Sequence, residues 1–345
     1  MRDKDKIIFA AYFQIVDFSG DELQNYIPEN TFNGAMYKLS QGFNRVLSYK
    51  LNRIKWKILV SGNLFITGDS GFHFHPEVTD DNKFEMIHEV VDCVVKNMTQ
   101  NEKINAILLK DIYKFQTDGD SILRKSNFSK FEIEHDMIFY VDPSWKKFED
   151  YLASVSSKYR VRTKKVMKVS SGLQRKELSL HDIQDNKEKL FELYMNVASR
   201  APFNLAYLTP NYFHTMKEAM DDRFRIFGYY YKEELIAFVS VFRLAEHIEV
   251  SYVGLEYELN RKLSVYQRML YDNIALGIDE GVEKIHYGRT APEIKSTVGA
   301  RPFEMYCYLK HTNPFSNFFI KPLTSYMKPK DWVLRNPFKE NAYNS

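Results

Sequence analysis

Two cations and two glycines lie between two apolar segments near the end of the sequence. Residues 285–303 read IHYGRTAPEIKSTVGARPF, in which Gly288 and Arg289 follow one apolar run and Lys295 and Gly299 precede the next. A simple connection between strands needs only a turn. Cations can bind a phosphate or a carboxylate, and a glycine lets the backbone approach a ligand closely. The segment is therefore a candidate anion site, with a loop carrying solvated surface cations as the alternative.

A second basic segment lies within residues 144–172, where apolar residues at helical spacing predict a helix. In its second half Arg160, Lys164 and Lys168 recur every four residues and share one helix face, with Arg162 alongside. Like charges at this spacing disfavour a helix unless an anion or an acidic surface compensates them. We therefore predict Arg160, Arg162 and Lys164 as substrate-binding residues. A solvated face, or pairing with acidic side chains, is the alternative.

The elements that must position these residues occur twice. The first region has predicted strands at 6–16, 55–68, 104–112 and 131–142, with a helix at 83–98. The second has a hairpin at 225–244, strands at 247–259, 284–289 and 301–310, and a helix at 264–281. In both, an antiparallel meander runs into a strand–helix–strand crossover, whose two strands pair in parallel. This order predicts a duplicated α/β unit with mixed sheets.

The two copies differ at their start, because only the second has a long helical lead-in, at 144–222. We therefore predict a shortened first copy. The predicted organisation is an N-terminal half at 1–142, a C-terminal half at 143–312 and a C-terminal extension at 313–345.

Composition excludes several classes of protein. The 345 residues are 44% hydrophobic and 27% charged, which predicts a packed globular chain. The net charge of +3 argues against DNA binding, which usually needs a strong basic excess. The two cysteines are expected as buried thiols, and no motif predicts a metal site. The apolar run near the N-terminus is too short to span a bilayer, so we expect a cytoplasmic protein.

Three stretches resemble one family of enzymes. YLASVSSKYRVRTKKVMK at 151–168, YYKEELIAFVSVF at 230–242 and IHYGRTAPEIKSTVGARP at 285–302 resemble the basic helix, the hairpin and the Gly-Arg…Lys…Gly segment of tandem-GNAT, FemAB-like acyltransferases of the peptidoglycan-bridge type. The resemblance covers nearly all of residues 5–312. It implies a duplicated GNAT-like acyltransferase fold and direct attack of an amine on a thioester or ester carbonyl.

The resemblance also implies where the donor binds, between strand 247–259 and strand 284–289. Transfer needs a base for the amine and a donor group near the developing oxyanion. Glu256 and Glu258 end the first strand, so either could be the base, and we select Glu256; a solvated strand end is the alternative for each. Tyr252 and Tyr287 are candidate oxyanion or leaving-group donors, with core aromatics as the alternative. Lys295 completes the predicted catalytic set as a contact to an anionic group.

One departure from the family concerns the donor loop. CoA-binding GNAT domains usually carry Gln/Arg-x-x-Gly-x-Gly/Ala before the crossover helix, whereas residues 260–267 here read NRKLSVYQ, without glycine. Ser264 and Gln267 instead predict a capping box, and nearby cations would supply the missing charge. The predicted cofactor-binding residues are Gly254, Arg261, Lys262, Ser264, Gly288 and Arg289.

These features predict an N-acyltransferase that acts on an amine of a cell-envelope precursor, a lipid or a related small molecule. The resemblance implies acyl-CoA as a co-substrate rather than a tightly bound cofactor. The basic face of the predicted helix would suit an acceptor that carries phosphate. One alternative is an aminoacyl-tRNA donor, although no heptad pair predicts the helical arm that such enzymes often carry. Another is a non-catalytic binding module that retains the fold, and contact with a membrane surface is a further alternative.

Overall fold

The computed structural model describes residues 1–3, 6–19, 55–68, 71–98, 102–200, 206–318, 320–325, 329 and 331–339. The chain divides into two compact units. Unit 1 comprises Met1–Glu134, Pro202–Ala206 and Glu304–Lys330, and unit 2 comprises His135–Ala201, Tyr207–Phe303 and Asp331–Ser345. Strands β8 (Ser129–Tyr140) and β14 (Arg301–His311) contribute residues to both units. For this reason the units differ from the predicted halves, 1–142 and 143–312.

Unit 1 is built around a strand–helix–strand crossover. Strand β4 (Phe13–Ser19) pairs antiparallel with β5 (Lys55–Ser61), and β5 pairs parallel with β7 (Ala106–Tyr113) through helix α2 (Asp80–Met98). Strand β14 lies antiparallel on the other side of β7. The smaller elements are β1 (Arg2–Asp3), β2 (Lys6–Ile7), β3 (Phe9–Ala11), β6 (Phe72–Phe74), η2 (Lys114–Gln116), α3 (Ser121–Lys125), α12 (Pro314–Asn317) and α13 (Ile320–Ser325).

Unit 2 has the strand order β8-β13-β12-β11-β10-β9. Its strands are β9 (Gln174–Glu177), β10 (Phe224–Tyr231), β11 (Glu234–Arg243), β12 (His247–Leu255) and β13 (Lys284–His286). Its helices are α4 (Phe148–Ser154), α5 (Ser157–Val169), α6 (Leu180–Asp185), α7 (Lys187–Ala198), α8 (Tyr212–Met220), η3 (Asp221–Arg223), α9 (Tyr257–Leu263), α10 (Val265–Asp279) and α11 (Pro292–Ser296). Strands β12 and β13 are parallel, and the other neighbouring pairs are antiparallel.

The same sequence of connections occurs in both units. β4–β5–α2–β7 in unit 1 corresponds to β11–β12–α10–β13 in unit 2, each with an antiparallel pair followed by a parallel one. This confirms the predicted duplicated α/β fold. Among the described strands, the order in unit 1 ends at β4, whereas unit 2 continues to β10 and β9. That difference agrees with the prediction of a shortened first copy.

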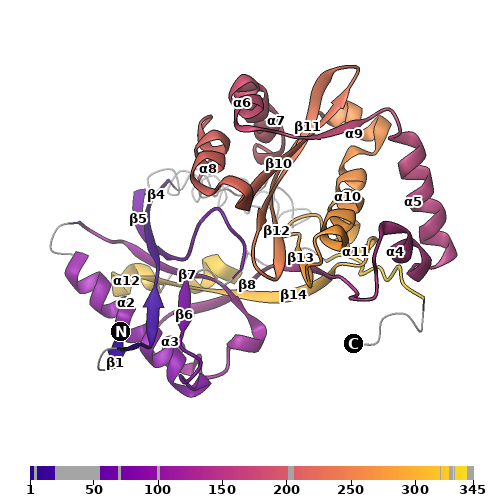
Figure 1. Cartoon of the computed structure of the whole chain (residues 1–345). Helices are drawn as coiled ribbons and strands as arrows, with labels where there is room; N and C mark the ends of the chain where they lie inside the picture. Colours follow the sequence, from indigo (N-terminus) through magenta and orange to yellow (C-terminus); the bar gives the residue numbers. More distant parts are fainter. Residues whose placement is uncertain are drawn as a thin grey trace, which may run out of the picture. The chain divides into compact units, whose positions relative to one another are not determined.

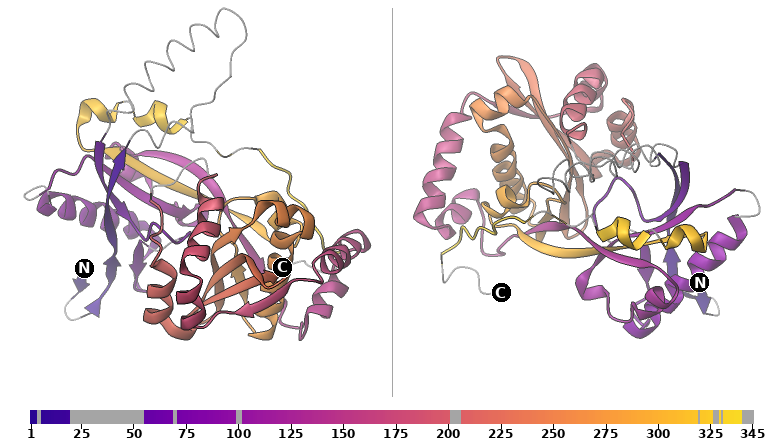
Figure 2. Two further views of the ribbon diagram at one scale, coloured as in Figure 1. Left: turned by 90° about the horizontal axis from the view of Figure 1, so that it is seen from above. Right: turned by 180° about the vertical axis from the view of Figure 1, so that it is seen from behind.

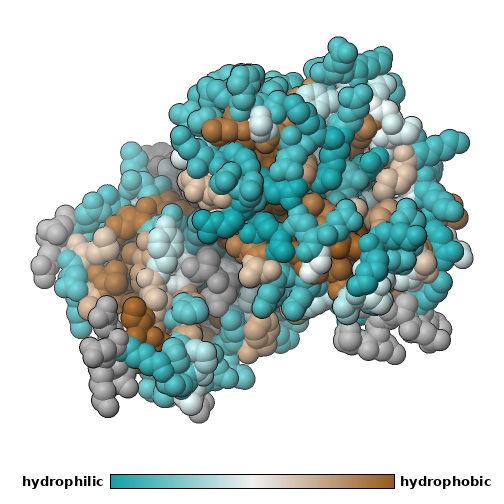
Figure 3. All heavy atoms as spheres, in the orientation of Figure 1, coloured by the Kyte–Doolittle hydropathy of each residue, from teal (hydrophilic) through white to brown (hydrophobic). Residues whose placement is uncertain are grey.

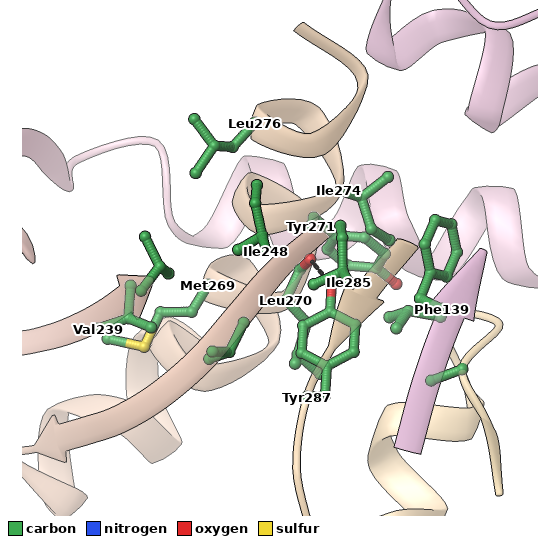
Figure 4. Packing of buried hydrophobic residues seen from close by; sticks show 14 of the residues in the cluster. Phe139, Val239, Ile248, Met269, Leu270, Tyr271, Ile274, Leu276, Ile285 and Tyr287 are labelled. Carbon is green, nitrogen blue, oxygen red and sulfur yellow. Dashed lines mark hydrogen bonds between the residues drawn. The ribbon is translucent and has the colours of Figure 1, made fainter. Parts of the chain in front are cut away.

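Helices cover both faces of the unit 2 sheet (Figures 1 and 2). Helices α4, α5 and α10 lie on one face, which we call the α10 face, and α6, α7 and α8 lie on the other, which we call the α7 face. On the α10 face, Ile248 and Ile285 pack against Met269 and Ile274 (Figure 4). Each such side chain, when fully buried, contributes about 1.5–3 kcal/mol of stability. This core fixes α10 over β12 and β13, the strands on which the candidate site is built.

Part of the predicted C-terminal extension belongs to the same core. Phe338 is buried, forms a bridge with Val155, and lies 6.3 Å from the ring of Tyr151. The main-chain N–H of Ser156 also donates to the carbonyl oxygen of Pro337 at 2.9 Å. Residues 331–339 therefore help to hold α4 and α5 on unit 2.

Candidate active site

Strands β12 and β13 separate after a short parallel pairing. Their register ends at Glu249 opposite His286. Beyond this point the chain after β13 follows β8, because the Tyr287 N–H donates to the Met137 carbonyl at 2.8 Å and the Met137 N–H donates to the Gly288 carbonyl at 3.2 Å. Strand β12 meanwhile continues along β11 to its end. Two adjacent parallel strands thus diverge in the middle of a sheet, as the predicted donor site requires.

A bulge in β12 lies directly beyond the point of separation. Between Val250 and Val253, β12 has one residue more than the partner stretch of β11. The buried hydroxyl of Ser240 accepts from the Tyr252 N–H at 2.9 Å and donates to the Tyr252 carbonyl at 3.3 Å. A bulge bends its strand and redirects the side chains beside it. Here it bends β12 just where the strand parts from β13.

The segment after β13 is held by Lys295, which is 3% exposed. The Lys295 ammonium donates to the carbonyl oxygens of Tyr287 at 2.7 Å and Gly288 at 3.0 Å, and also to that of Arg289. Gly288 has a φ of 69°, a conformation that favours glycine. The charged end of Lys295 is therefore turned to its own backbone. This corrects the predicted anion contact: Lys295 shapes the loop, and Gly288 provides its turn.

On the α7 face, an aromatic cluster surrounds Tyr252. Its ring lies 5.6 Å from that of Tyr194, 5.7 Å from that of Tyr212 and 6.4 Å from that of Phe213. Burial raises the pKa of Tyr252, and the positive charge of Arg289 counteracts part of this rise. The predicted residue Arg289 is therefore near enough to act electrostatically on Tyr252. A phenol with a raised pKa stays protonated and can donate a hydrogen bond.

Tyr287 and Gly254 have structural explanations. The Tyr287 hydroxyl donates to the Leu270 carbonyl of α10 at 2.8 Å, and its ring is buried in the core (Figure 4). A Cβ at Gly254 would lie 2.2 Å from the Phe238 ring and 2.7 Å from the Leu193 Cβ. Tyr287 is thus a core aromatic residue, which was the alternative considered from the sequence. Gly254 allows β12 to pack closely against α7 rather than to approach a ligand.

The strand predicted at 247–259 ends earlier, and the capping box is absent. Strand β12 ends at Leu255, and Glu256 is the residue before α9, although its N–H still donates to the Ile236 carbonyl of β11 at 2.8 Å. Ser264 has left-handed dihedral angles and makes no side-chain cap. Instead, the Asn260 side chain accepts from the Tyr266 N–H at 2.8 Å. The prediction of a Ser264–Gln267 capping box is therefore wrong, because a left-handed Ser264 does not present its hydroxyl to the helix.

The predicted basic residues of α5 have different surroundings. Arg160 donates to the carbonyls of Leu152 at 3.0 Å and Val155 at 2.9 Å, which satisfies the end of α4. With the Gln267 amide oriented so that its oxygen faces α5, Arg162 donates to it at 2.6 Å. Lys164 is exposed. Arg160 and Lys295 therefore both bind backbone carbonyls, Arg160 at the end of α4 and Lys295 in the segment after β13.

Exposed cations nevertheless gather near the start of α10. Helices α5 and α9 contact each other and α10. The exposed cations of these two helices include Arg162, Lys164, Arg261 and Lys262. In the view of Figure 3, hydrophilic side chains predominate over α5. We call these four residues the α5/α9 cations.

A buried polar cluster lies where β12 and β13 separate, and it was not predicted from the sequence. The His286 Nδ1 lies 3.0 Å from Asp136 Oδ2 and 3.8 Å from Glu249 Oε2, and the His247 ring lies 4.8 Å from that of His286. Asp136 is fully buried, and Glu249 and His286 are nearly so. Burial, with the charge of His286 adding to it, lowers the pKa of His247 to about 4. Four titratable groups thus meet where β12 and β13 part.

Sequence alternation could have located part of this cluster. Ile285 and Tyr287 are core residues of the α10 face, so His286 between them must point to the α7 face. Glu249, between Ile248 and Val250, follows the same rule. The Asp136 partner could not be inferred, because 150 residues separate it from His286.

The corresponding separation in unit 1 is bridged. Strands β5 and β7 pair as far as Ser61 opposite Leu109. The Lys110 ammonium then donates to the carbonyls of Asn63 at 3.0 Å and Ile66 at 2.9 Å, which lie in the chain after β5. A buried lysine therefore ties the two diverging segments of unit 1 together. The separation in unit 2 is the better candidate for a ligand.

Three further findings bear on the predicted ligands and location. Within the described part of the chain, no group of three or more His, Cys, Asp or Glu side chains could hold a metal ion. No helix among the described residues is long and apolar enough to cross a membrane. Both cysteines are free thiols, with Cys307 buried as predicted, whereas Cys93 is exposed.

The sequence matches one protein family over most of its length. The FemAB-like family model, described as peptidoglycan biosynthesis/recognition, matches residues 72–328. The chain belongs to the FemAB-like family. This confirms the resemblance inferred from the three sequence stretches. No curated protein matches the sequence.

Solved structures resemble the fold of this FemAB-like chain at low identity. The structure of L-PGS from Bacillus licheniformis matches with a TM-score of 0.51 and 10% identity, over 80% of this chain and 86% of that chain. A crystal structure of FemX matches with a TM-score of 0.49 and 13% identity, over 74% and 80% of the respective chains. A GCN5-related N-acetyltransferase from Sphaerobacter thermophilus matches with a TM-score of 0.46 and 9% identity, over 88% and 96%. At these identities the likeness shows the fold alone.

Proposed function

We propose that this FemAB-like protein transfers an acyl or aminoacyl group to an amine of a cell-envelope precursor, a lipid or a related small molecule. The observation that carries the proposal is the separation of β12 and β13 beyond Glu249 and His286, with a titratable cluster at its closed end. Membership in the FemAB-like family supports the connection to the cell envelope. The reaction would take place in the cytoplasm, where acyl-CoA and aminoacyl-tRNA, the two candidate donors, are made.

The proposed reaction is direct transfer. The amine nitrogen attacks the donor carbonyl, a C–N bond forms, and the C–S bond of a thioester or the C–O bond of an ester breaks. The amine must lose a proton to a base, and the leaving thiolate or alkoxide must gain one. Holding both reactants in the divergence of two strands would supply proximity and orientation. The Tyr252 hydroxyl, whose pKa is raised by burial, would donate to the leaving group or the oxyanion.

The donor is proposed to bind through its phosphates to the α5/α9 cations. The start of α10 offers fewer free amides than a glycine-rich loop would, because Asn260 occupies the Tyr266 N–H. Side-chain cations would replace them, as Arg261 and Lys262 are exposed in the last turn of α9. This arrangement fits the pyrophosphate of acyl-CoA or the backbone of an aminoacyl-tRNA.

The same Asn260 contact favours a second candidate function, a non-catalytic module that keeps the fold. Such a protein would bind an envelope precursor through Tyr252 and Arg289 without a donor. An assay of acyl transfer distinguishes the acyltransferase from the non-catalytic binding module. Purified protein would be incubated with acetyl-CoA, or with a mixture of aminoacyl-tRNAs, and a panel of amine acceptors, and mass spectrometry would detect acylated product. Acceptor binding without product under both donors would favour the binding module.

Reversing two charges on α9 should weaken donor binding selectively. For the Arg261→Glu/Lys262→Glu double variant we expect the KM for the donor to rise about tenfold or more, with kcat little changed. Exposed ionic contacts to phosphate are each of modest strength, and a tenfold change corresponds to about 1.4 kcal/mol. Lys103→Glu, which changes an exposed cation of unit 1, is the control and should leave this KM unchanged. Equal effects of the two variants would indicate loss of general charge rather than a donor site.

A further inference from the structure

His286 has one nitrogen bound and one unused. Its Nδ1 lies 3.0 Å from the Asp136 carboxylate, the geometry in which an N–H donates to the acid. Its Nε2 is buried and has no hydrogen-bond partner among the described residues. When Nδ1 carries the proton, Nε2 presents a lone pair. A buried polar atom left unpaired costs roughly 1–3 kcal/mol, so a purely structural histidine would be expected to satisfy both nitrogens.

The position of this pair matches the place where the reaction needs a base. His286 is the last residue of β13 that pairs with β12, and Asp136 precedes the β8 residues that pair with β13. Both side chains belong to unit 2 and to the α7 face, the face that also carries Tyr252. Glu256, the base predicted from sequence, lies seven positions after Glu249, beyond the end of β12.

We propose that His286 is the general base of the transfer reaction and that Asp136 is its positioning residue. The inference rests on the proposed acyltransferase function. His286 Nε2 takes a proton from the acceptor nitrogen as that nitrogen forms its bond to the donor carbonyl. The proton then passes to the departing sulfur or oxygen as its bond to the carbonyl carbon breaks. The Asp136 carboxylate holds the tautomer and stabilises the imidazolium that forms.

The surrounding charges are compatible with this role. The titratable or charged side chains that face the two histidines are Asp136, Glu249, Lys284 and Arg243. His247 stays neutral at neutral pH because burial lowers its pKa to about 4. It therefore adds no positive charge beside His286 when the enzyme works. The Glu249 Oε2 lies 3.8 Å from the same Nδ1.

Steady-state transfer by the full chain tests the proposal, with the donor that supports the wild-type reaction. We expect His286→Gln to lower kcat/KM by about 100-fold or more, the usual range for loss of a general base. The acidic limb of the pH profile of kcat/KM should disappear in this variant. Asp136→Asn should lower kcat/KM and shift the pH at which the acidic limb occurs. Glu249→Gln should retain the acidic limb. These variants are compared at matched far-UV circular dichroism and thermal midpoint.

The outcomes distinguish failure of the His286 assignment from failure of the proposed acyltransferase function. If the wild type transfers and His286→Gln stays within about threefold of it, the base assignment fails while the proposed function stands. Loss of the acidic limb in Glu249→Gln but not in His286→Gln would move the role to Glu249. If wild-type protein transfers from no donor, the proposed function fails and the assignment falls with it. Should His286→Gln not fold, ¹⁵N-histidine NMR of the wild type decides: a proton on Nε2 at neutral pH would overturn the proposal.

Discussion

Replacing Lys295 by methionine should lower the free energy of unfolding by about 3 kcal/mol or more. Methionine keeps the length of the side chain but cannot donate, which leaves the carbonyls of Tyr287, Gly288 and Arg289 without the ammonium. A buried acceptor that loses its partner costs roughly 1–3 kcal/mol. Relief of the desolvated charge offsets part of this cost. Urea denaturation, followed by fluorescence or circular dichroism, measures the change as a shift of the midpoint at constant slope.

Lys262→Met provides the matched control, since Lys262 is exposed on α9. Its effect should stay within about 0.5 kcal/mol, as for most surface substitutions. The reading of Lys295 as a loop-forming residue would be contradicted if Lys295→Met unfolded at the wild-type midpoint while losing donor or acceptor affinity. That result would instead support the anion contact predicted from sequence.

Gly254→Ala should cost about 2–3 kcal/mol of stability. The new methyl group would lie 2.2 Å from the Phe238 ring and 2.7 Å from the Leu193 Cβ, so β12 and α7 must move apart or the ring must rotate. Overpacking of a filled core usually costs 1–3 kcal/mol. Because Tyr252 lies two residues before Gly254 and packs on α7, transfer activity should fall as well. Thermal unfolding and the transfer assay measure the two effects.

Gly172→Ala is the control for Gly254→Ala. A Cβ at Gly172 meets only the Tyr231 ring, at 3.5 Å, which is ordinary contact. Stability should change little, or rise slightly through reduced freedom of the unfolded chain. If both alanine variants changed stability by the same small amount, Gly254 would not be required for the close packing of β12 on α7.

The order of elements was predictable from sequence because hydrophobic periodicity reports it directly. The helix predicted at 264–281 is α10, Val265–Asp279, and the hairpin predicted at 225–244 is β10 and β11. The end of β12 was misjudged, because residues 256–263 mix polar and apolar positions in a way that fits a strand end as well as the helix α9. Local patterns do not decide such short segments.

The site was only partly predictable, for a different physical reason. The strands that diverge, and the close turn at Gly288, follow from the fold and from residue types. The direction of a charged side chain does not. Lys295 and Arg160 look equivalent to anion-binding cations in sequence, yet both bind carbonyls five to eight residues earlier in the chain. The pairing of Asp136 with His286 depends on β8 lying beside β13, which no local pattern specifies.

One measurement tests the central claim most directly, that the separation of β12 and β13 in unit 2 holds the transferable group. Crystals of the protein would be soaked with a thioether analogue of acetyl-CoA and, separately, with a stable amide analogue of aminoacyl-adenosine. We expect density for the acyl carbonyl of at least one analogue between residues 250–255 and residues 287–289, close to His286. The claim would be contradicted if both analogues gave density elsewhere on the chain. It would also be contradicted if the analogues bound to saturation and no density appeared beside these residues.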